Sequence, residues 1–440
     1  MPTRLIYNIG QLAGIHSATQ PLRGPELASL PSIHNAWLLI EDDRIADFGP
    51  MTEMPPELAK RREPRDPSVL NSVTGDSIDA AGGTILPAWC DSHTHLVFAG
   101  SRESEFVDKL KGLSYAEINA KGGGILNSAR KLAATKEDDL FNSAWQRLNE
   151  LTQLGTGAIE IKSGYGLTVE GELKMLRVIK RLKQKSPLAI KATFLGAHTY
   201  PAEFKENHQG YIDSIIYEML PVIAKEGLAD YIDVFCEKGF FSPEETETIV
   251  RAGMAHGLIP KIHANQLNLS GGVEVGVKLN ALSVDHLETM DEHTINTLAA
   301  SPTIGTLLPT AAFFLRMPFQ PARQLIDAGC AIALATDFNP GSSPSGNMNL
   351  VVAIELYPDE HAPGRSHQRG DHQRRLCHVA RRPAGEHHRR QKGEPDSHPP
   401  HPLPGLSALF LRHQPHRTGI YQRRTHLKQD YVRTEEKIKA

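Results

Sequence analysis

Two histidines separated by one residue end a short apolar stretch near residue 90. The segment from Thr84 to His95 reads T-I-L-P-A-W-C-D-S-H-T-H. Side chains two apart in an extended strand leave the same face, so His93 and His95 are expected to point the same way. Neutral imidazole is the commonest metal ligand in proteins, and such a pair forms half of a metal site. The pair alone is a weak signal, because exposed strands also carry it.

Residue types that bind metals follow later apolar stretches at the same point. His263, the pair Asp285-His286 and Asp337 each come directly after or at the end of such a stretch. In a parallel barrel the catalytic groups lie where the strands end, so these side chains would converge on one mouth. Three histidines and one aspartate suit a divalent zinc or iron ion with an open position for water. Each residue alone has a structural alternative, and only the joint placement favours a metal site that activates water.

Two further positions are typical of substrate binding. Tyr165 lies between two glycines after an apolar stretch, where it can reach a ligand. Arg102, seven residues beyond His95, has the planar fork that binds a carboxylate in bidentate fashion. His198 follows another apolar stretch and is either a site residue or a loop histidine.

The elements that must position these residues alternate between strand and helix from residue 84 onward. Apolar stretches predict strands at 158–161, 189–195, 231–235, 259–262, 281–284 and 331–335. Helices are predicted over 168–185 and 242–256, the second opening with Ser242, Pro243 and two acids as helix starts do. Repeated strand-helix units favour a TIM-like (β/α)8 barrel, with an open doubly wound sheet as the alternative.

The sequence divides into three parts. Residues 1–80 predict a small β domain, with a hairpin of 36–40 and 44–48 around Asp42-Asp43. Residues 81–354 form the predicted hydrolase barrel. Residues 355–440 are expected to be an irregular tail in place of the last helix and closing strands.

The tail has an unusual composition. Residues 361–440 hold eleven of the 21 histidines and 17 Lys and Arg against seven Asp and Glu. Runs such as His387-His388-Arg389-Arg390 have no amphipathic period. A frame-shifted translation is the favoured interpretation, ahead of a disordered tail and of a binding segment for polyanions or metals. Reading the coding DNA around codon 354 in all three frames distinguishes them.

Composition excludes several classes of protein. The chain has 440 residues, 22% of them charged, and a formal net charge of −3, which suits a globular protein without nucleic-acid or membrane partners. No apolar run reaches 18 residues, and the N-terminus lacks an export signal. Four cysteines without C-x-x-C spacing are typical of reduced thiols, so we expect a cytoplasmic protein.

Seven motifs together resemble the imidazolonepropionase family of the metal-dependent amidohydrolase superfamily. From about residue 30 to about residue 354 the chain carries, in order, H-T-H-L-V-F-A-G-S-R-E-S-E-F, G-G-G-I, E-I-K-S-G-Y-G-L, L-G-A-H, K-I-H-A-N-Q, V-D-H-L-E and T-D-F-N-P-G-S-S. The resemblance implies a barrel plus a small β domain built from both chain ends. It also implies hydrolysis of 4-imidazolone-5-propanoate to N-formimidoyl-L-glutamate in histidine degradation.

The resemblance also assigns roles to individual residues. The implied ligands of one divalent metal, Zn or Fe, are His93, His95, His263 and Asp337. The implied binding residues for the carboxylate-bearing substrate are Arg102, Tyr115, Tyr165, His198, Gln266, Asn339, Gly341 and Ser342. His286 matches the histidine that orients or activates the nucleophile. Some relatives carry glutamate at Gln266, and because an amide is no base, proton transfer is assigned to Asp337 and His286.

Alternatives remain at this point. One is another cyclic amide hydrolase or a base deaminase on the same site, which Arg102 disfavours because a neutral base has no carboxylate to bind. Another is a catalytically impaired product of the altered C-terminus, with an unclosed barrel of lower stability. A homodimer is a further expectation.

Overall fold

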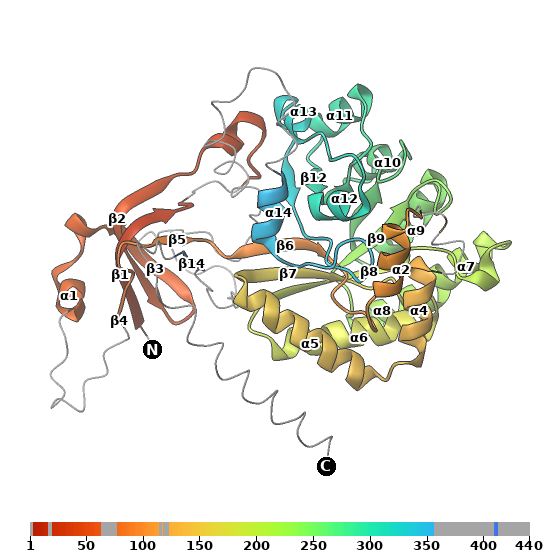
Figure 1. Cartoon of the computed structure of the whole chain (residues 1–440), viewed down its shortest axis with the longest axis horizontal. Coiled ribbons are helices and arrows are strands. Elements are labelled where there is room, and N and C mark those ends of the chain that lie inside the picture. The colour runs from red at the N-terminus through yellow and green to blue at the C-terminus, as the bar shows by residue number, and fades with distance from the viewer. Residues whose placement is uncertain are drawn as a thin grey trace, which may run out of the picture.

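The described residues form two β-sheets, one with eight strands and one with six. A computed structural model describes residues 3–15, 20–62, 77–113, 117, 123–355 and the backbone of 409–411. Within these residues an eight-stranded parallel sheet carries helices on its outside, and a six-stranded sheet lies to one side of it (Figure 1).

The parallel sheet follows chain order, as repeated strand-helix units require. Its order is β13-β12-β11-β10-β9-β8-β7-β6. The strands are β6 (Trp89–Thr94), β7 (Thr156–Lys162), β8 (Ala189–Ala197), β9 (Tyr231–Cys236), β10 (Ile259–Ala264), β11 (Ser283–His286), β12 (Ile304–Leu307) and β13 (Ile332–Leu334). All six predicted barrel strands are confirmed. Sequence analysis missed β12, a four-residue strand with a glycine and a threonine inside it.

The first and last strands meet and nearly close the barrel. The His95 amide donates to the Phe338 carbonyl at 2.9 Å, and the Asp337 amide donates to the His93 carbonyl at 3.0 Å. The buried carboxylate of Asp91 adds two bonds, from the amide and the hydroxyl of Thr336 at 3.0 and 2.7 Å. The described residues therefore form a (β/α)8-type barrel, and the open doubly wound sheet is excluded.

Helices follow most barrel strands and cover them. They are α2 (Glu103–Leu110), α4 (Gly124–Ala134), α5 (Glu137–Gln153), α6 (Val169–Lys185), α7 (His208–Asp213), α8 (Leu220–Glu226), α9 (Pro243–Ala255), α10 (Gly272–Lys278), α11 (Glu292–Ala299), α12 (Pro309–Leu315), α13 (Ala322–Asp327) and α14 (Met348–Glu355). The two predicted helices are confirmed as α6 and α9. Ser242 and Glu245 form a capping box at α9, and Thr168 caps α6.

The small sheet holds the predicted hairpin. β2 (Ser32–Glu41) pairs antiparallel with β3 (Arg44–Pro50), and Asp42 has the left-handed conformation with φ of 55°. The sheet order is β14-β5-β1-β2-β3, with β1 (Thr3–Ala13), β5 (Thr84–Leu86), β14 (Leu409–Leu411), and β4 (Ser77–Asp79) beside β1. The short helix α1 (Pro56–Ala59) follows β3.

Segments from both chain ends therefore meet in the small sheet. β14 pairs antiparallel with β5. The rest of the predicted tail after Glu355 lies outside the described residues, and the predicted boundaries 1–80, 81–354 and 355–440 stay predictions.

Candidate active site

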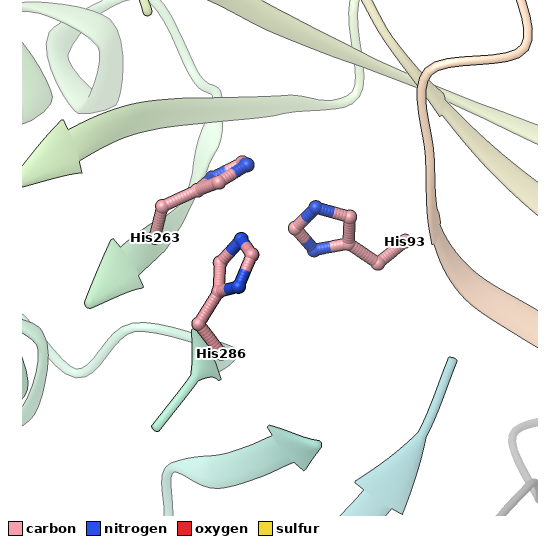
Figure 2. A group of neighbouring side chains, drawn as sticks. All are labelled: His93, His263 and His286. Carbon is pink, nitrogen blue, oxygen red and sulfur yellow. The ribbon is translucent and has the colours of Figure 1, made fainter. Parts of the chain in front are cut away.

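Three histidines and an aspartate meet at the mouth of the barrel. His93 and His95 come from β6 and its end, His263 from β10, and Asp337 follows β13. The Nε2 atoms of His93 and His95 each lie 3.5 Å from Asp337 Oδ1. The His93 and His263 rings are 4.4 Å apart between centroids. Figure 2 shows His93, His263 and His286 pointing toward one another from different strands.

The donor set fits a divalent cation. Ring nitrogens of His93, His263 and His286 lie within 4.8 Å of one another, as do the ligand atoms of His93, His95 and Asp337. His93 Nε2 and His263 Nε2 are buried and have no hydrogen-bond partner among the described residues. Buried polar atoms are normally paired, so these nitrogens indicate that a ligand completes the site. Three imidazoles and one carboxylate form a donor set that zinc and iron accept.

Burial keeps the imidazoles neutral. It lowers the pKa of His93, His95 and His263, and neighbouring cationic groups such as Lys162 lower it further in His93 and His263. A neutral imidazole has the free lone pair that a metal needs.

Carboxylates fix the orientation of two of these rings from behind. Asp285 Oδ2 lies 2.7 Å from His93 Nδ1, and Asp233 Oδ2 lies 2.9 Å from His263 Nδ1. Asp285 accepts the Nδ1 proton of His93, so Nε2 of that ring stays free to face the centre, and Asp233 lies at ion-pair distance from the His263 ring. Asp233 Oδ1 also accepts from the His263 amide at 3.0 Å, which ties the carboxylate to the strand.

Beneath the centre lies a layer that we call the charged floor: Glu160, Lys162, Asp233, Lys261 and Asp285. Lys162 Nζ donates to Glu160 at 2.7 Å and to Asp233 at 2.8 Å. Lys261 Nζ bonds to Glu160 and lies 3.4 Å from Asp285. Burial acts to lower the pKa of Lys162, but Asp233, Glu160 and Asp285 outweigh it and raise that pKa. Lys162 is therefore charged, and both lysines have carboxylate partners.

Asp337 stands at the start of a tightly bonded loop. Its backbone has φ of 51°, and its Oδ2 accepts from the Ser342 hydroxyl at 3.2 Å. Asn339 shapes the loop, because its Oδ1 accepts from the amides of Gly341 and Ser342 at 2.8 and 2.7 Å. Burial raises the pKa of Asp337 to about 6, against the opposing effect of His286.

His286 is a strained residue that faces the same centre. Its φ is 90°, which is rare outside glycine and typical of functional sites. Its Nδ1 lies 3.5 Å from Glu288 Oε1. Burial acts to lower the pKa of His286, but the carboxylates of Glu288, Asp337 and Asp285 outweigh it and raise that pKa. His286 therefore carries a proton more readily than the other histidines of the site.

A cavity of about 290 Å³ opens over this centre. It brings together most of the predicted site residues with five apolar side chains. Its lining consists of His95, Arg102, Ile125, Tyr165, His198, Phe235, His263, Gln266, Leu267, His286, Leu315, Met317, Asp337, Asn339 and Ser342. His93 and Gly341 do not line the cavity, and Tyr115 lies outside the described residues.

Arg102 reaches the cavity from the start of α2. Its Nε donates to the Ser128 hydroxyl at 3.1 Å, and its Nη1 lies 3.6 Å from Glu105 Oε2. Its Cζ lies 5.8 Å from the centre of the Tyr165 ring. A Cβ built on Gly341 would lie 2.3 Å from Arg102 Nη1, so glycine is needed there to leave room for the guanidinium.

His198 presents a hydrogen-bond acceptor to the cavity. Its Nδ1 lies 2.9 Å from the Gly164 carbonyl, which can only accept, so Nδ1 carries the proton. Burial lowers the pKa of His198 to about 3. The ring is therefore neutral, and its Nε2 lone pair is left for a ligand.

Of the charged floor, only Asp285 was predicted from the sequence, as a residue at the mouth of the barrel; the structure places it behind His93 instead. The other floor residues have a signal in the sequence: polar or charged residues two apart in otherwise apolar strands, as in Glu160 with Lys162 and Lys261 with His263. Residues two apart share a strand face, so such pairs in a barrel point inward.

Comparison with known proteins agrees with this geometry. No protein-family model matches the chain. An imidazolonepropionase of Flavobacterium johnsoniae is 56% identical over 363 residues, covering 81% of this chain and 84% of that protein. An imidazolonepropionase of Geobacillus sp. (strain WCH70) is 40% identical over 350 residues, covering 79% and 80%.

Solved structures share the fold at low identity. A guanine deaminase from C. acetobutylicum with bound guanine superposes with a TM-score of 0.55 at 14% identity, covering 80% of this chain and 78% of that one. An amidohydrolase from an environmental sample of the Sargasso Sea gives 0.53 at 16% identity, covering 86% and 78%. A nearly closed parallel barrel with this donor set at its mouth makes the protein an amidohydrolase-type barrel hydrolase.

Within that class the relatives decide the family. The chain belongs to the imidazolonepropionase family. Among the described residues, no helix is long and apolar enough to cross a membrane.

Proposed function

We propose that this chain hydrolyses the cyclic amide bond of 4-imidazolone-5-propanoate to N-formimidoyl-L-glutamate. The observation that carries the proposal is one cavity that joins a His-His-His-Asp centre to Arg102. A ring amide needs an activated water, and a propionate arm needs a cation at the other end of the cavity. The relatives named for this activity, at up to 56% identity, support the same substrate.

His93, His95, His263 and Asp337 hold the divalent ion in this proposal. When bound, the ion acts as a Lewis acid that makes water nucleophilic near neutral pH and polarises the ring carbonyl. Asp285 and Asp233 orient the His93 and His263 rings for that purpose. We propose Zn or Fe, because both accept imidazole and carboxylate donors in an open site.

Asp337 and His286 divide the proton chemistry. Asp337 accepts a proton from the attacking water and returns it to the ring nitrogen that leaves. Its place between the histidine pair and the cavity puts its carboxylate within reach of both. His286, whose pKa is raised, donates to the oxygen that gains negative charge as the amide carbon becomes tetrahedral.

The remaining cavity residues orient the substrate. Arg102 binds the propionate, and His198 Nε2 accepts a hydrogen bond from a ring N–H. Tyr165 and Gln266 contact the ring from the wall, and Gln266, an amide, takes no part in proton transfer. Asn339 and Ser342 complete the wall, and Gly341 acts by leaving space for Arg102. Tyr115 belongs to the same proposed set.

The setting of the enzyme is part of the proposal. We place it in the cytoplasm, as a homodimer that binds no nucleic acid. Size-exclusion chromatography with light scattering at several protein concentrations tests the dimer.

The test is turnover by the purified full chain loaded with Zn²⁺ or Fe²⁺. We expect loss of 4-imidazolone-5-propanoate and formation of N-formimidoyl-L-glutamate by mass spectrometry. A matched imidazolone without the propionate should be a poor substrate, since Arg102 then has no partner. Turnover of guanine by metal-loaded chain that ignores the propanoate would contradict the proposal.

A further inference from the structure

A buried glutamate on helix α6 holds the loop that carries Tyr165. The Glu172 side chain is 0% exposed, and its carboxylate accepts three backbone N–H groups. Its Oε2 accepts from Gly164 at 3.1 Å, and its Oε1 accepts from Gly166 at 2.7 Å and Leu167 at 3.0 Å. These amides lie between β7 and α6, outside any helix or strand. One carboxylate thus satisfies three backbone donors of the loop.

The loop is built to approach the helix closely. A Cβ on Gly166 would lie 2.2 Å from the Glu172 backbone nitrogen, and a Cβ on Gly171 would lie 2.7 Å from Gly166 Cα. Leu167 has φ of 53°, a conformation that non-glycine residues rarely adopt. Contacts this close require glycine at both positions, and the three hydrogen bonds to Glu172 join the turn to the helix.

In the chain, the peptide group that joins Gly164 to Tyr165 is preceded and followed by amides that donate to Glu172. Its carbonyl accepts from His198 Nδ1 at 2.9 Å, and its N–H lies 3.4 Å from Met175 Sδ. The amide before it and the two amides after it are all held by Glu172. Orientation of this one peptide therefore determines both the placement of Tyr165 and the tautomer of His198.

We propose that Glu172 is a positioning residue for substrate binding, which acts through the Gly164–Leu167 loop on Tyr165 and His198. The inference rests on the proposed function, because it assigns those two side chains to the substrate. Glu172 itself does not line the cavity, and its carboxylate accepts from the backbone of Gly164, Gly166 and Leu167. Its loss should therefore weaken substrate binding while leaving the metal centre intact.

The first test is E172Q in the full-length, metal-loaded enzyme. Glutamine has the same shape but replaces one acceptor oxygen with an NH2 group, so at least one loop amide loses its acceptor. We expect KM to rise about tenfold with kcat within about threefold, because ground-state and transition-state contacts are lost together. Metal content by plasma mass spectrometry should not change.

The matched control is E170Q, a substitution on the same helical turn at an exposed position. It should leave KM and kcat as they are in the wild type. If E172Q does not fold, E172D serves instead, since it retracts both oxygens by one methylene and should also raise KM. Unchanged KM in a folded, metal-loaded variant overturns the proposal, and so does a loss of metal with normal KM in the loaded fraction.

A second measurement needs no catalysis. Hydrogen exchange of the Gly164, Gly166 and Leu167 amides should be slow in the wild type and faster in E172Q. Rapid exchange in the wild type would overturn the proposal. Wild-type chain that binds metal but does not turn over the propanoate would instead contradict the proposed function, and the exchange result would still decide whether Glu172 holds the loop.

Discussion

Two lysines, Lys162 buried on the floor of this barrel and Lys109 half-buried near its mouth, have pKa values shifted in opposite directions. Lys162 lies on the charged floor between Glu160, Asp233 and Asp285, and these carboxylates raise its pKa against the effect of burial. Lys109 lies near the mouth and donates to the Gly341 carbonyl at 3.0 Å. Burial, and then the charge of Arg102, lowers the pKa of Lys109 to about 8.

The difference separates a structural charge cluster from a binding site. On the floor, each lysine has a carboxylate partner, so no unpaired positive charge is left to bind a ligand. Two of these carboxylates, Asp285 and Asp233, also lie against metal-site histidines. At the mouth, Arg102 and Lys109 lie together with Glu105 as the carboxylate next to Arg102. Two cationic side chains with one neighbouring carboxylate leave an excess of positive charge beside the cavity. This excess favours an anionic ligand, in agreement with a substrate that carries a carboxylate.

The largest effect on activity is expected at the proposed metal centre, which lies between the floor and the mouth. Asp337→Asn should lower kcat by about 10²- to 10⁴-fold, because an amide cannot take the proton from water. Steady-state kinetics with metal content measured on the same sample separates proton transfer from metal loss. Full activity with metal bound would show that another group carries the proton.

A substitution on the floor should act on stability. Lys162→Met should lower the free energy of unfolding by about 3–5 kcal/mol, because it leaves Asp233 buried without a lysine partner and removes one of the two lysines bonded to Glu160. Urea unfolding of the metal-free protein measures this loss without ligand linkage. Lys191→Met is the control on the neighbouring strand β8, where an exposed pair with Asp230 should contribute about 0–1 kcal/mol. An equal loss of unfolding free energy in Lys162→Met and Lys191→Met would contradict the distinction between buried and exposed ion pairs.

A substitution at the mouth should act on binding instead. Arg102→Met should lower kcat/KM for the propanoate by about 10- to 100-fold, the range for a lost hydrogen bond to a charged group. Its unfolding midpoint in urea should change less than that of Lys162→Met. The imidazolone without a propionate is the control substrate, for which wild type and variant should not differ. A similar loss with both substrates would mean that Arg102 acts on the ring or on the fold.

The smallest effect is a pH-dependent one at Lys109. Its pKa of about 8 in the folded state lies below the ordinary value of 10.5, so the unfolded chain binds more protons between these pH values. The charged lysine thus costs stability below pH 8, and the cost disappears as pH rises to 10.5. The melting temperature of Lys109→Met minus that of the wild type should therefore be more positive at pH 7 than at pH 10.

The matched control for this prediction is Lys111→Met. Lys111 is exposed two residues further along the chain. The difference in melting temperature between Lys111→Met and the wild type should be the same at pH 7 and at pH 10. A flat difference for Lys109→Met would contradict the lowered pKa.

Much of the fold followed from local patterns. Apolar stretches indicated six barrel strands, and Ser242 with Glu245 indicated the start of α9, because strand periodicity and helix caps depend on neighbouring residues. The strand β12 was missed, because four residues with Gly305 and Thr306 inside give little apolar signal. Closure of the barrel was also beyond local patterns, since Asp91 bonds to Thr336 across 245 residues.

The candidate site divides in the same way. His93, His95, His263 and Asp337 were recognisable as donor types at strand ends, and the family motifs assigned Arg102 its carboxylate. The sequence by itself thus determined which chemistry is present, because side-chain type and strand register are local properties. Only the tertiary structure decided which partner each group has: Asp285 lies behind His93, and Glu172 turns the Tyr165 loop. Hydrogen bonding is directional and short-ranged, so such pairings exist only once distant segments are packed together.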